Sequence, residues 1–180
     1  MSKSYVAMTF DGAVSAALYE LTEPIRRSCP SPCVGKGVTM PTALHLTVYY
    51  GFHSSVTVSA LQAYLNQFWP RHALVLHGLT LDHHMAGRSK IITVIPKSHL
   101  LYRLNTLLKE FPGALPPKYL PYRPHISLAE VVSGYRLPVL GTEFDSGEVL
   151  GEPVVPDGLW FVTPETDTLA KTWTHLELPV

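Results

Sequence analysis

Two spacings of apolar residues occur along this chain, one that predicts strands and one that predicts helices. Short apolar or alternating runs, typical of strands, occupy positions 4–10, 44–50, 73–81, 89–95, 149–155, 159–163 and 172–178. Apolar residues recur at helical spacing across positions 56–69 and 100–111, and an alanine-rich stretch after Asp11 predicts a helix running towards Arg27. Pro70 and Pro112 directly follow the two later helices and mark their ends, because proline cannot continue a helix.

The segments between these elements are rich in residues that favour turns and loops. Positions 28–41 and 116–124 are proline-rich, and each leads into a predicted strand. The polar stretch that contains His83, His84 and Gly87 separates two strands and predicts the turn of a hairpin. The order of elements is strand, helix, strand, helix, hairpin, helix, strand and further strands, which predicts an α+β fold of two similar halves. We expect a single domain over residues 1–180.

Two of the predicted strands carry the same short pattern, a histidine two residues before a hydroxyl side chain. The first is His45-Leu46-Thr47-Val48 and the second is His125-Ile126-Ser127-Leu128. Because successive side chains of a strand point to opposite faces, each histidine shares a face with its hydroxyl, and the apolar residues point into a core. Tyr49 continues the face of His45 and Thr47 in the same alternation. Two such strands side by side would form a pocket with two imidazoles and two hydroxyls.

Composition narrows the class of partner. Of the 180 residues, 46% are hydrophobic and 16% are charged, so the chain can bury a substantial core. Fourteen basic and fourteen acidic residues give no net charge, which disfavours a long nucleic acid held through many phosphates and favours a small substrate. Two cysteines are too few for a disulfide framework, and no apolar run reaches the roughly 18 residues of a membrane span. We therefore expect a cytoplasmic protein that does not enter a membrane; its oligomeric state stays open.

With their flanking residues, the two motifs resemble those of the 2H phosphoesterase superfamily, the LigT-like proteins, which are named for two H-x-[ST] motifs. Tyr49-Tyr50-Gly51 after the first motif and Tyr122-Arg123-Pro124 before the second are similar to the flanks found in that family. The resemblance implies a bilobal, pseudo-duplicated α+β fold with two antiparallel sheets around a central cleft and helices outside. It also implies metal-independent cleavage of a phosphodiester, with no cofactor.

Members of this superfamily act on several kinds of small phosphodiester. They cleave 2′,3′-cyclic phosphates, 2′,5′-linked nucleotides and, among viral members, cyclic oligonucleotide second messengers of host immunity. The neutral composition favours a small cyclic or 2′,5′-linked nucleotide as the substrate, and a viral enzyme of this kind would work in the cytoplasm of its host. A 2′,3′-cyclic phosphodiesterase acting on RNA ends and a non-catalytic nucleotide-binding module are the alternatives.

The chemistry of the motif residues gives each an expected role. His45 and His125 would act as acid and base, because the ordinary pKa of imidazole near 6.5 lets one ring be neutral while another is protonated. The hydroxyls of Thr47 and Ser127 would donate hydrogen bonds to phosphate oxygens. The sequence does not say which histidine is the acid and which is the base.

Outside the motifs, aromatic residues offer rings on which a base can stack, and basic residues offer charge to phosphate. The aromatic candidates for substrate binding are Tyr49, Tyr119, Tyr122, Trp160 and Trp173. The basic candidates beside the second motif are Lys118 and Arg123. The adjacent His83 and His84 lack the converging ligands of a metal site, so we expect none there.

Overall fold

A computed structural model describes residues 3–21, 23, 38–39, 44–86, 89–117, 120–132, 148–150, 152–164 and 170–179. The helices are α1 (Gly12–Glu20), α3 (Val58–Phe68) and α4 (His99–Glu110). The strands are β1 (Ser4–Thr9), β2 (Val38–Thr39), β3 (His45–Phe52), β4 (His77–Ala86), β5 (Ser89–Lys97), β6 (Ile126–Val132), β7 (Glu148–Leu150), β8 (Gly158–Pro164) and β9 (Lys171–Leu176).

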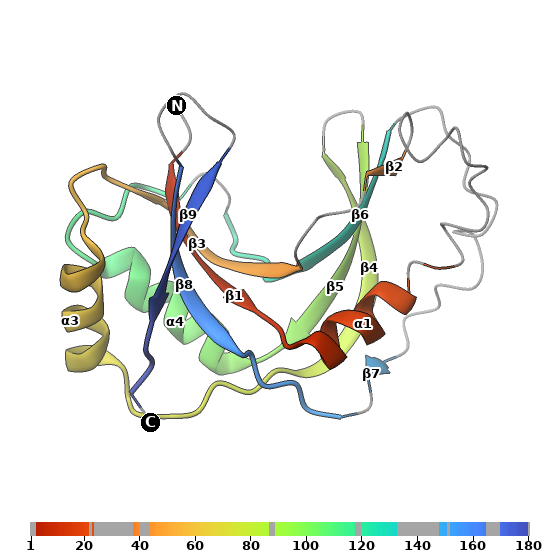
Figure 1. Cartoon of the computed structure of the whole chain (residues 1–180), viewed down its shortest axis with the longest axis horizontal. Helices are drawn as coiled ribbons and strands as arrows, with labels where there is room; N and C mark the ends of the chain where they lie inside the picture. The colour runs from red at the N-terminus through yellow and green to blue at the C-terminus, as the bar shows by residue number, and fades with distance from the viewer. Residues whose placement is uncertain are drawn as a thin grey trace.

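These strands form one antiparallel sheet in the order β7-β4-β5-β6-β3-β1-β8-β9, with β2 paired beside β6. The sheet has two halves, which meet where β3 pairs with β6 through Leu46 and Ile126. Figure 1 shows the half with β8 and β9 on the left and the half with β4 and β5 on the right of this junction. The predicted α+β fold of two halves is confirmed, and the two predicted sheets are joined into one at this pair.

The helices pack against one face of the sheet, and this face holds the core. Leu101, Leu104 and Leu108 recur at helical spacing along α4 and are fully buried. They belong to the same cluster of buried side chains as Leu46 and Ile126. Fully burying a leucine contributes roughly 1.5–3 kcal/mol, so the apolar residues between the motif histidines and hydroxyls help to hold the halves together. The opposite face, called the open face below, carries the other residues of the two motifs.

The helix boundaries follow the capping and stop signals of the sequence. The Asp11 side chain accepts a hydrogen bond of 2.7 Å from the backbone N–H of Val14 at the start of α1. Thr57 caps α3 through the backbone N–H of Ala60, and Pro70 lies just beyond the helix. The helices predicted at 56–69 and 100–111 are confirmed to within two residues. The predicted continuation of α1 towards Arg27 lies mostly outside the described residues.

The hairpin of β4 and β5 is longer than predicted. His83 and His84 belong to β4 and not to the turn, and they pair with Ile92 and Ile91 of β5. The β-branched isoleucines favour strand on the partner side, which explains why the pairing extends past the predicted end. Within the part of the chain described here, no helix is long and apolar enough to span a membrane.

Candidate active site

The two H-x-[ST] motifs lie side by side at the junction of the sheet halves. The pair that joins β3 to β6 is formed by the middle residues of the two motifs. In antiparallel strands the positions on either side of such a pair also face each other, so His45 stands across from Ser127 and Thr47 across from His125. All four side chains are half-buried and lie on the open face. The structure thus brings together the four residues that the sequence predicts for the site.

A backbone hydrogen bond holds the ring of His125. Its Nδ1 lies 2.9 Å from the carbonyl oxygen of Arg123. Because a carbonyl oxygen can only accept, Nδ1 carries a hydrogen and donates it, and proton exchange with a substrate falls to Nε2. The Arg123 side chain, a predicted phosphate contact, is exposed, and Arg123 takes part in this hydrogen bond through its backbone.

His45 lies among aromatic rings from other strands. Its ring centroid is 5.8 Å from that of Trp173 of β9, with the planes at 85°, and 6.2 Å from that of Tyr5 of β1. The edge-on contact with Trp173 and the tilted contact with Tyr5, whose planes meet at 35°, restrict rotation of the imidazole on the open face. The first motif histidine is therefore positioned by packing against residues far away in the sequence.

A β-bulge in β3 changes the face on which Tyr49 lies. Thr47 pairs with Ala7 and Tyr49 pairs with Val6, so Val48 has no counterpart on β1. An extra residue of this kind shifts the alternation of side chains along the strand by one position. The prediction that Tyr49 shares the open face with Thr47 is therefore wrong.

Because of the bulge, Tyr50 lies on the open face in place of Tyr49. Tyr49 is 3% exposed in the core, where its hydroxyl donates to the carbonyl oxygen of Leu115 and burial raises the pKa of its phenol. Tyr50 takes the open-face position beside Tyr5, with ring centroids 5.9 Å apart. A second irregularity follows at Gly51, which lies between the partners of Ser4 and Tyr5, and here a glycine inside a strand is the sequence signal. The sequence carries no such signal at Val48.

Side chains satisfy two carbonyl groups at the bulge. Asn105 of α4 donates from Nδ2 to the carbonyl oxygen of Val48 at 2.6 Å, and the Tyr122 hydroxyl donates to that of Thr47 at 3.1 Å. Burial of the Tyr122 phenol raises its pKa, and the nearby Tyr102 adds to this effect. Tyr122, a predicted substrate contact, therefore ties the chain before the second motif to the strand of the first.

Replacing Tyr122 with phenylalanine removes this hydrogen bond and keeps the ring. We expect the free energy of unfolding to fall by about 1 kcal/mol, because the carbonyl group of Thr47 loses its side-chain donor. Urea denaturation measures the change. Tyr102→Phe, at a side chain that is 47% exposed, is the matched control and should leave stability unchanged. Equal stability of the two variants would contradict a role for the Tyr122 hydroxyl.

Trp160 reaches the open face from β8, and its polar atom is already bonded within the protein. Nε1 donates to Oγ1 of Thr9 at 2.8 Å, and the Thr9 hydroxyl donates to the carboxylate of Asp157. A Cβ at Gly158 would come within 2.5 Å of Nε1, so a side chain there would displace the indole. The Trp160 N–H is thus already used within the protein, and only the indole ring could contact a ligand. Lys118 and Tyr119, two further predicted contacts, lie outside the described residues.

Strand β9 brings Trp173, one of the predicted aromatic candidates, to the open face, together with two residues that the sequence did not single out. Lys171, Trp173 and His175 alternate along the strand and so share one face. Trp173 pairs with Val162, which pairs with Tyr5, so this face of β9 is continuous with the open face of β1. The alternation at positions 171–175 is visible in the sequence. No spacing along the chain, however, predicts that these side chains lie on the same face of the sheet as the motifs.

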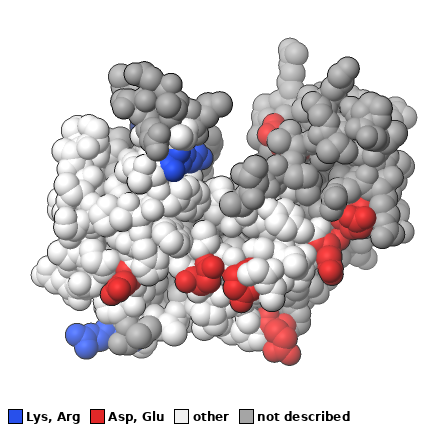
Figure 2. Space-filling model, in the orientation of Figure 1, with Lys and Arg blue, Asp and Glu red and all other residues white. Residues whose placement is uncertain are grey.

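A hollow separates the two halves in the view of Figure 2, and one basic group lies beside it. Figure 2 shows this hollow, with blue atoms at its rim on the left half and most red atoms along the lower part of the molecule. In that half, Lys3 before β1 and Lys171 at the start of β9 are exposed. Among the described residues, positive charge therefore lies beside the hollow, which suits an anionic ligand.

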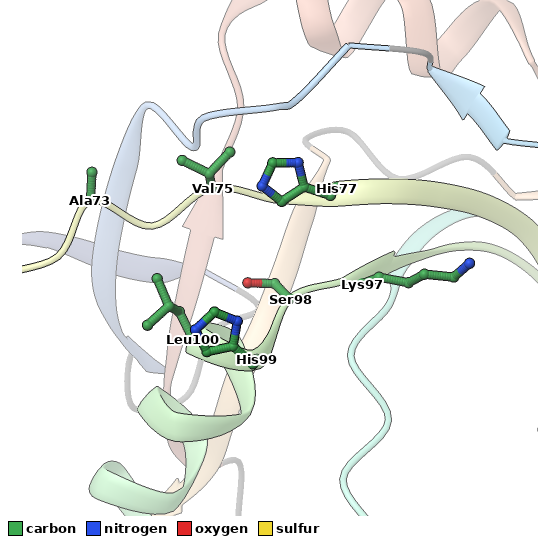
Figure 3. Close-up of a pocket in the computed structure, with 7 residues that line it drawn as sticks. All are labelled: Ala73, Val75, His77, Lys97, Ser98, His99 and Leu100. Atoms are coloured by element: carbon green, nitrogen blue, oxygen red, sulfur yellow. The ribbon is translucent and has the colours of Figure 1, made fainter.

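A second cavity lies away from the motifs (Figure 3). It has a volume of about 420 Å³, and its polar lining comes from His77 of β4, Lys97 of β5, and Ser98 and His99 at the start of α4. It contains no residue of either motif. In the described part of the chain, no three histidine, cysteine or acidic residues are grouped as ligands for a metal ion. The junction of β3 and β6 is therefore our candidate active site.

No protein-family model and no curated protein matches this chain. Solved structures do match it in fold. TT0787 of Thermus thermophilus has a TM-score of 0.66 and 19% identity, over 97% of this chain and 95% of that chain. LigT of E. coli complexed with phosphate has a TM-score of 0.59 and 15% identity, over 98% and 95%. Usb1 of Kluyveromyces marxianus has a TM-score of 0.53 and 9% identity, over 98% and 97%.

LigT is also solved in complexes with 3′-AMP, NADP+ and ATP. At these identities the likeness concerns the fold, and it extends over nearly the whole chain. The chain therefore has a LigT-like fold, as its paired motifs predict.

Proposed function

We propose that this protein is a metal-independent phosphodiesterase in which His45 and His125 form an acid–base pair. The observation that carries this proposal is the pairing of β3 with β6 through the middle residues of the two motifs. It sets each histidine across from the hydroxyl residue of the other motif, on the face that borders the hollow. Two imidazoles with two hydroxyl donors suit proton transfer to and from a phosphate ester.

The reaction is a displacement at phosphorus. One histidine takes a proton from the attacking water while the water oxygen forms a bond to phosphorus. The bond between phosphorus and the departing ribose oxygen breaks, and the other histidine, which is protonated, gives its proton to that oxygen. Thr47 and Ser127 donate hydrogen bonds to the non-bridging oxygens, where negative charge grows. If a ribose hydroxyl attacks in place of water, the same transfers yield a 2′,3′-cyclic phosphate.

The substrate that we propose is a small cyclic or 2′,5′-linked nucleotide. The absence of net charge on the chain supports a short ligand, because binding to a long nucleic acid gains most of its affinity from many basic contacts. The complexes of LigT with 3′-AMP and ATP are consistent with a nucleotide at this fold. A viral enzyme that degrades cyclic oligonucleotide messengers of host immunity is the most specific form of this proposal.

A panel of substrates tests the activity and its chemistry together. The purified protein is incubated in EDTA with cyclic mono-, di- and trinucleotides, 2′,5′-oligoadenylate and an RNA that ends in a 2′,3′-cyclic phosphate. Mass spectrometry identifies the products, and ¹⁸O-labelled water shows whether water attacks phosphorus directly. We expect cleavage of at least one small cyclic or 2′,5′-linked nucleotide at an undiminished rate in EDTA.

Other outcomes separate the alternatives. Cleavage of the RNA end alone would replace the proposed substrate by the second candidate, an RNA-end phosphodiesterase. Loss of all activity in EDTA would contradict the metal-independent mechanism. Binding of a panel member without cleavage, equally strong in a protein with both His45→Ala and His125→Ala, would indicate a nucleotide-binding module.

A further inference from the structure

Strand β9 presents a cation and an indole to the open face next to the candidate active site. Lys171 and Trp173 lie two residues apart on the same side of the strand. Trp173 is half-buried, and its ring centroid lies 5.8 Å from that of His45. Trp173 therefore lies against His45, and Lys171 lies two residues further along β9.

Lys171 is held in place by an aromatic side chain and not by a carboxylate among the described residues. Its Nζ donates to the Tyr5 hydroxyl at 3.1 Å and lies 5.2 Å from the centroid of the Tyr5 ring. Tyr5 is 5% exposed and also contacts Trp173, with ring centroids 6.4 Å apart. A neutral phenol positions the ammonium without cancelling its charge, so the charge is available to an anion.

Tyr5 links the two β9 residues to the first motif. It contacts the rings of His45 and Trp173 as well as the ammonium of Lys171. An anion at Lys171 would thus lie one aromatic residue away from a phosphate at His45. Nucleotides that carry two phosphates around one nucleoside offer that arrangement, with a base or sugar between two anions.

We propose that Lys171 and Trp173 form a second subsite, in which Lys171 binds a phosphate other than the scissile one and Trp173 stacks against the base. This inference rests on the proposed function, because it assumes that the scissile phosphate lies at His45 and His125. It deepens that function by naming the preferred substrate class: a nucleotide with an additional phosphate, as in an oligonucleotide or a 5′-phosphorylated cyclic nucleotide.

Binding of two product analogues tests the Lys171 part of the subsite. Calorimetry compares 3′-AMP, which has one phosphate, with adenosine 3′,5′-bisphosphate, which has two. We expect the bisphosphate to bind about tenfold more tightly to the unaltered protein. A hydrogen bond to a charged group is stronger than one between neutral groups, and the exposure of this lysine to water limits the gain in affinity to about that factor. Lys171→Ala should abolish this preference and Lys171→Arg should retain it. Lys109→Ala, at an exposed lysine in the last turn of α4, is the matched control and should change nothing.

Tryptophan fluorescence tests the Trp173 part. A base stacked on Trp173 should quench its emission, and Trp173→Phe should remove most of the quenching and weaken binding of both nucleotides about tenfold. The same variant should leave the affinity for inorganic phosphate unchanged. Thr174→Ala, at an exposed neighbour on the other face of β9, controls for disturbance of the strand, and circular dichroism checks that every variant is folded.

The failure of this inference can be told apart from failure of the proposed function. Equal weakening of both nucleotides by Lys171→Ala, or full quenching in Trp173→Phe, would overturn the subsite even if the protein cleaves its substrates. A selective effect of Lys171→Ala on the bisphosphate would support the subsite even if no substrate of the panel is cleaved. If neither nucleotide binds to the unaltered protein, the subsite is wrong.

Discussion

Replacing either His45 or His125 with alanine should lower kcat of the proposed phosphodiesterase about a thousandfold. General acid–base catalysis by a positioned side chain typically contributes between 10²- and 10⁴-fold, and each replacement removes one of the two proton-transfer groups. Because both histidines act in the same displacement, the double variant should lose little more than either single variant. Steady-state kinetics on the substrate identified by the panel measures these losses.

The pH dependence of kcat/KM separates a catalytic role from a structural one. The unaltered enzyme should give a bell-shaped profile, because one histidine must be neutral and the other protonated. Each alanine variant should lose one limb of this profile. His53→Ala, at an exposed histidine one residue beyond β3, is the control and should keep both limbs and full activity. A bell-shaped profile in the His125→Ala variant would remove His125 from the acid–base pair.

The sequence predicted correctly which face each pair of motif residues shares, because this placement depends on local geometry. In a strand, His45 and Thr47 must share a face whatever the partner strand is, and the same holds for the second motif. The meeting of the motifs followed from the family resemblance. The structure shows how the motifs meet: Leu46 and Ile126, the apolar residues at their centres, form an antiparallel pair.

Tyr49 could not be placed correctly because its position depends on residues far away in the sequence. The alternation of β3 breaks at Val48, and the carbonyl groups at the break bond to Asn105 and Tyr122. For the same reason, Lys171 of β9, unlike Trp173, was not predicted. Lys171 lies against Tyr5 on the open face because β9 pairs with β8, which pairs with β1, and no spacing along the chain encodes that order of strands.

Replacing Asn105 with leucine should lower the free energy of unfolding by about 2 kcal/mol. Leucine has the same branching and the same number of side-chain heavy atoms as asparagine but removes the donor to the carbonyl oxygen of Val48. A polar group left without its partner away from water costs about 1–3 kcal/mol. The bulge also sets the direction of Thr47, so kcat should fall about tenfold with KM little changed. Urea denaturation and kinetics measure the two effects.

The hydrogen bond from Tyr122 to the carbonyl oxygen of Thr47 allows a further test of the role of Asn105. Asn105 and Tyr122 hold adjacent carbonyl groups of one strand, so their losses should be coupled and the Asn105→Leu, Tyr122→Phe variant should depart from the sum of the single changes. Arg103→Leu, at an exposed position of α4, provides the control for a new leucine on this helix. If Asn105→Leu is no less stable than Arg103→Leu, the bulge is maintained by core packing of Tyr49 and not by its hydrogen bonds.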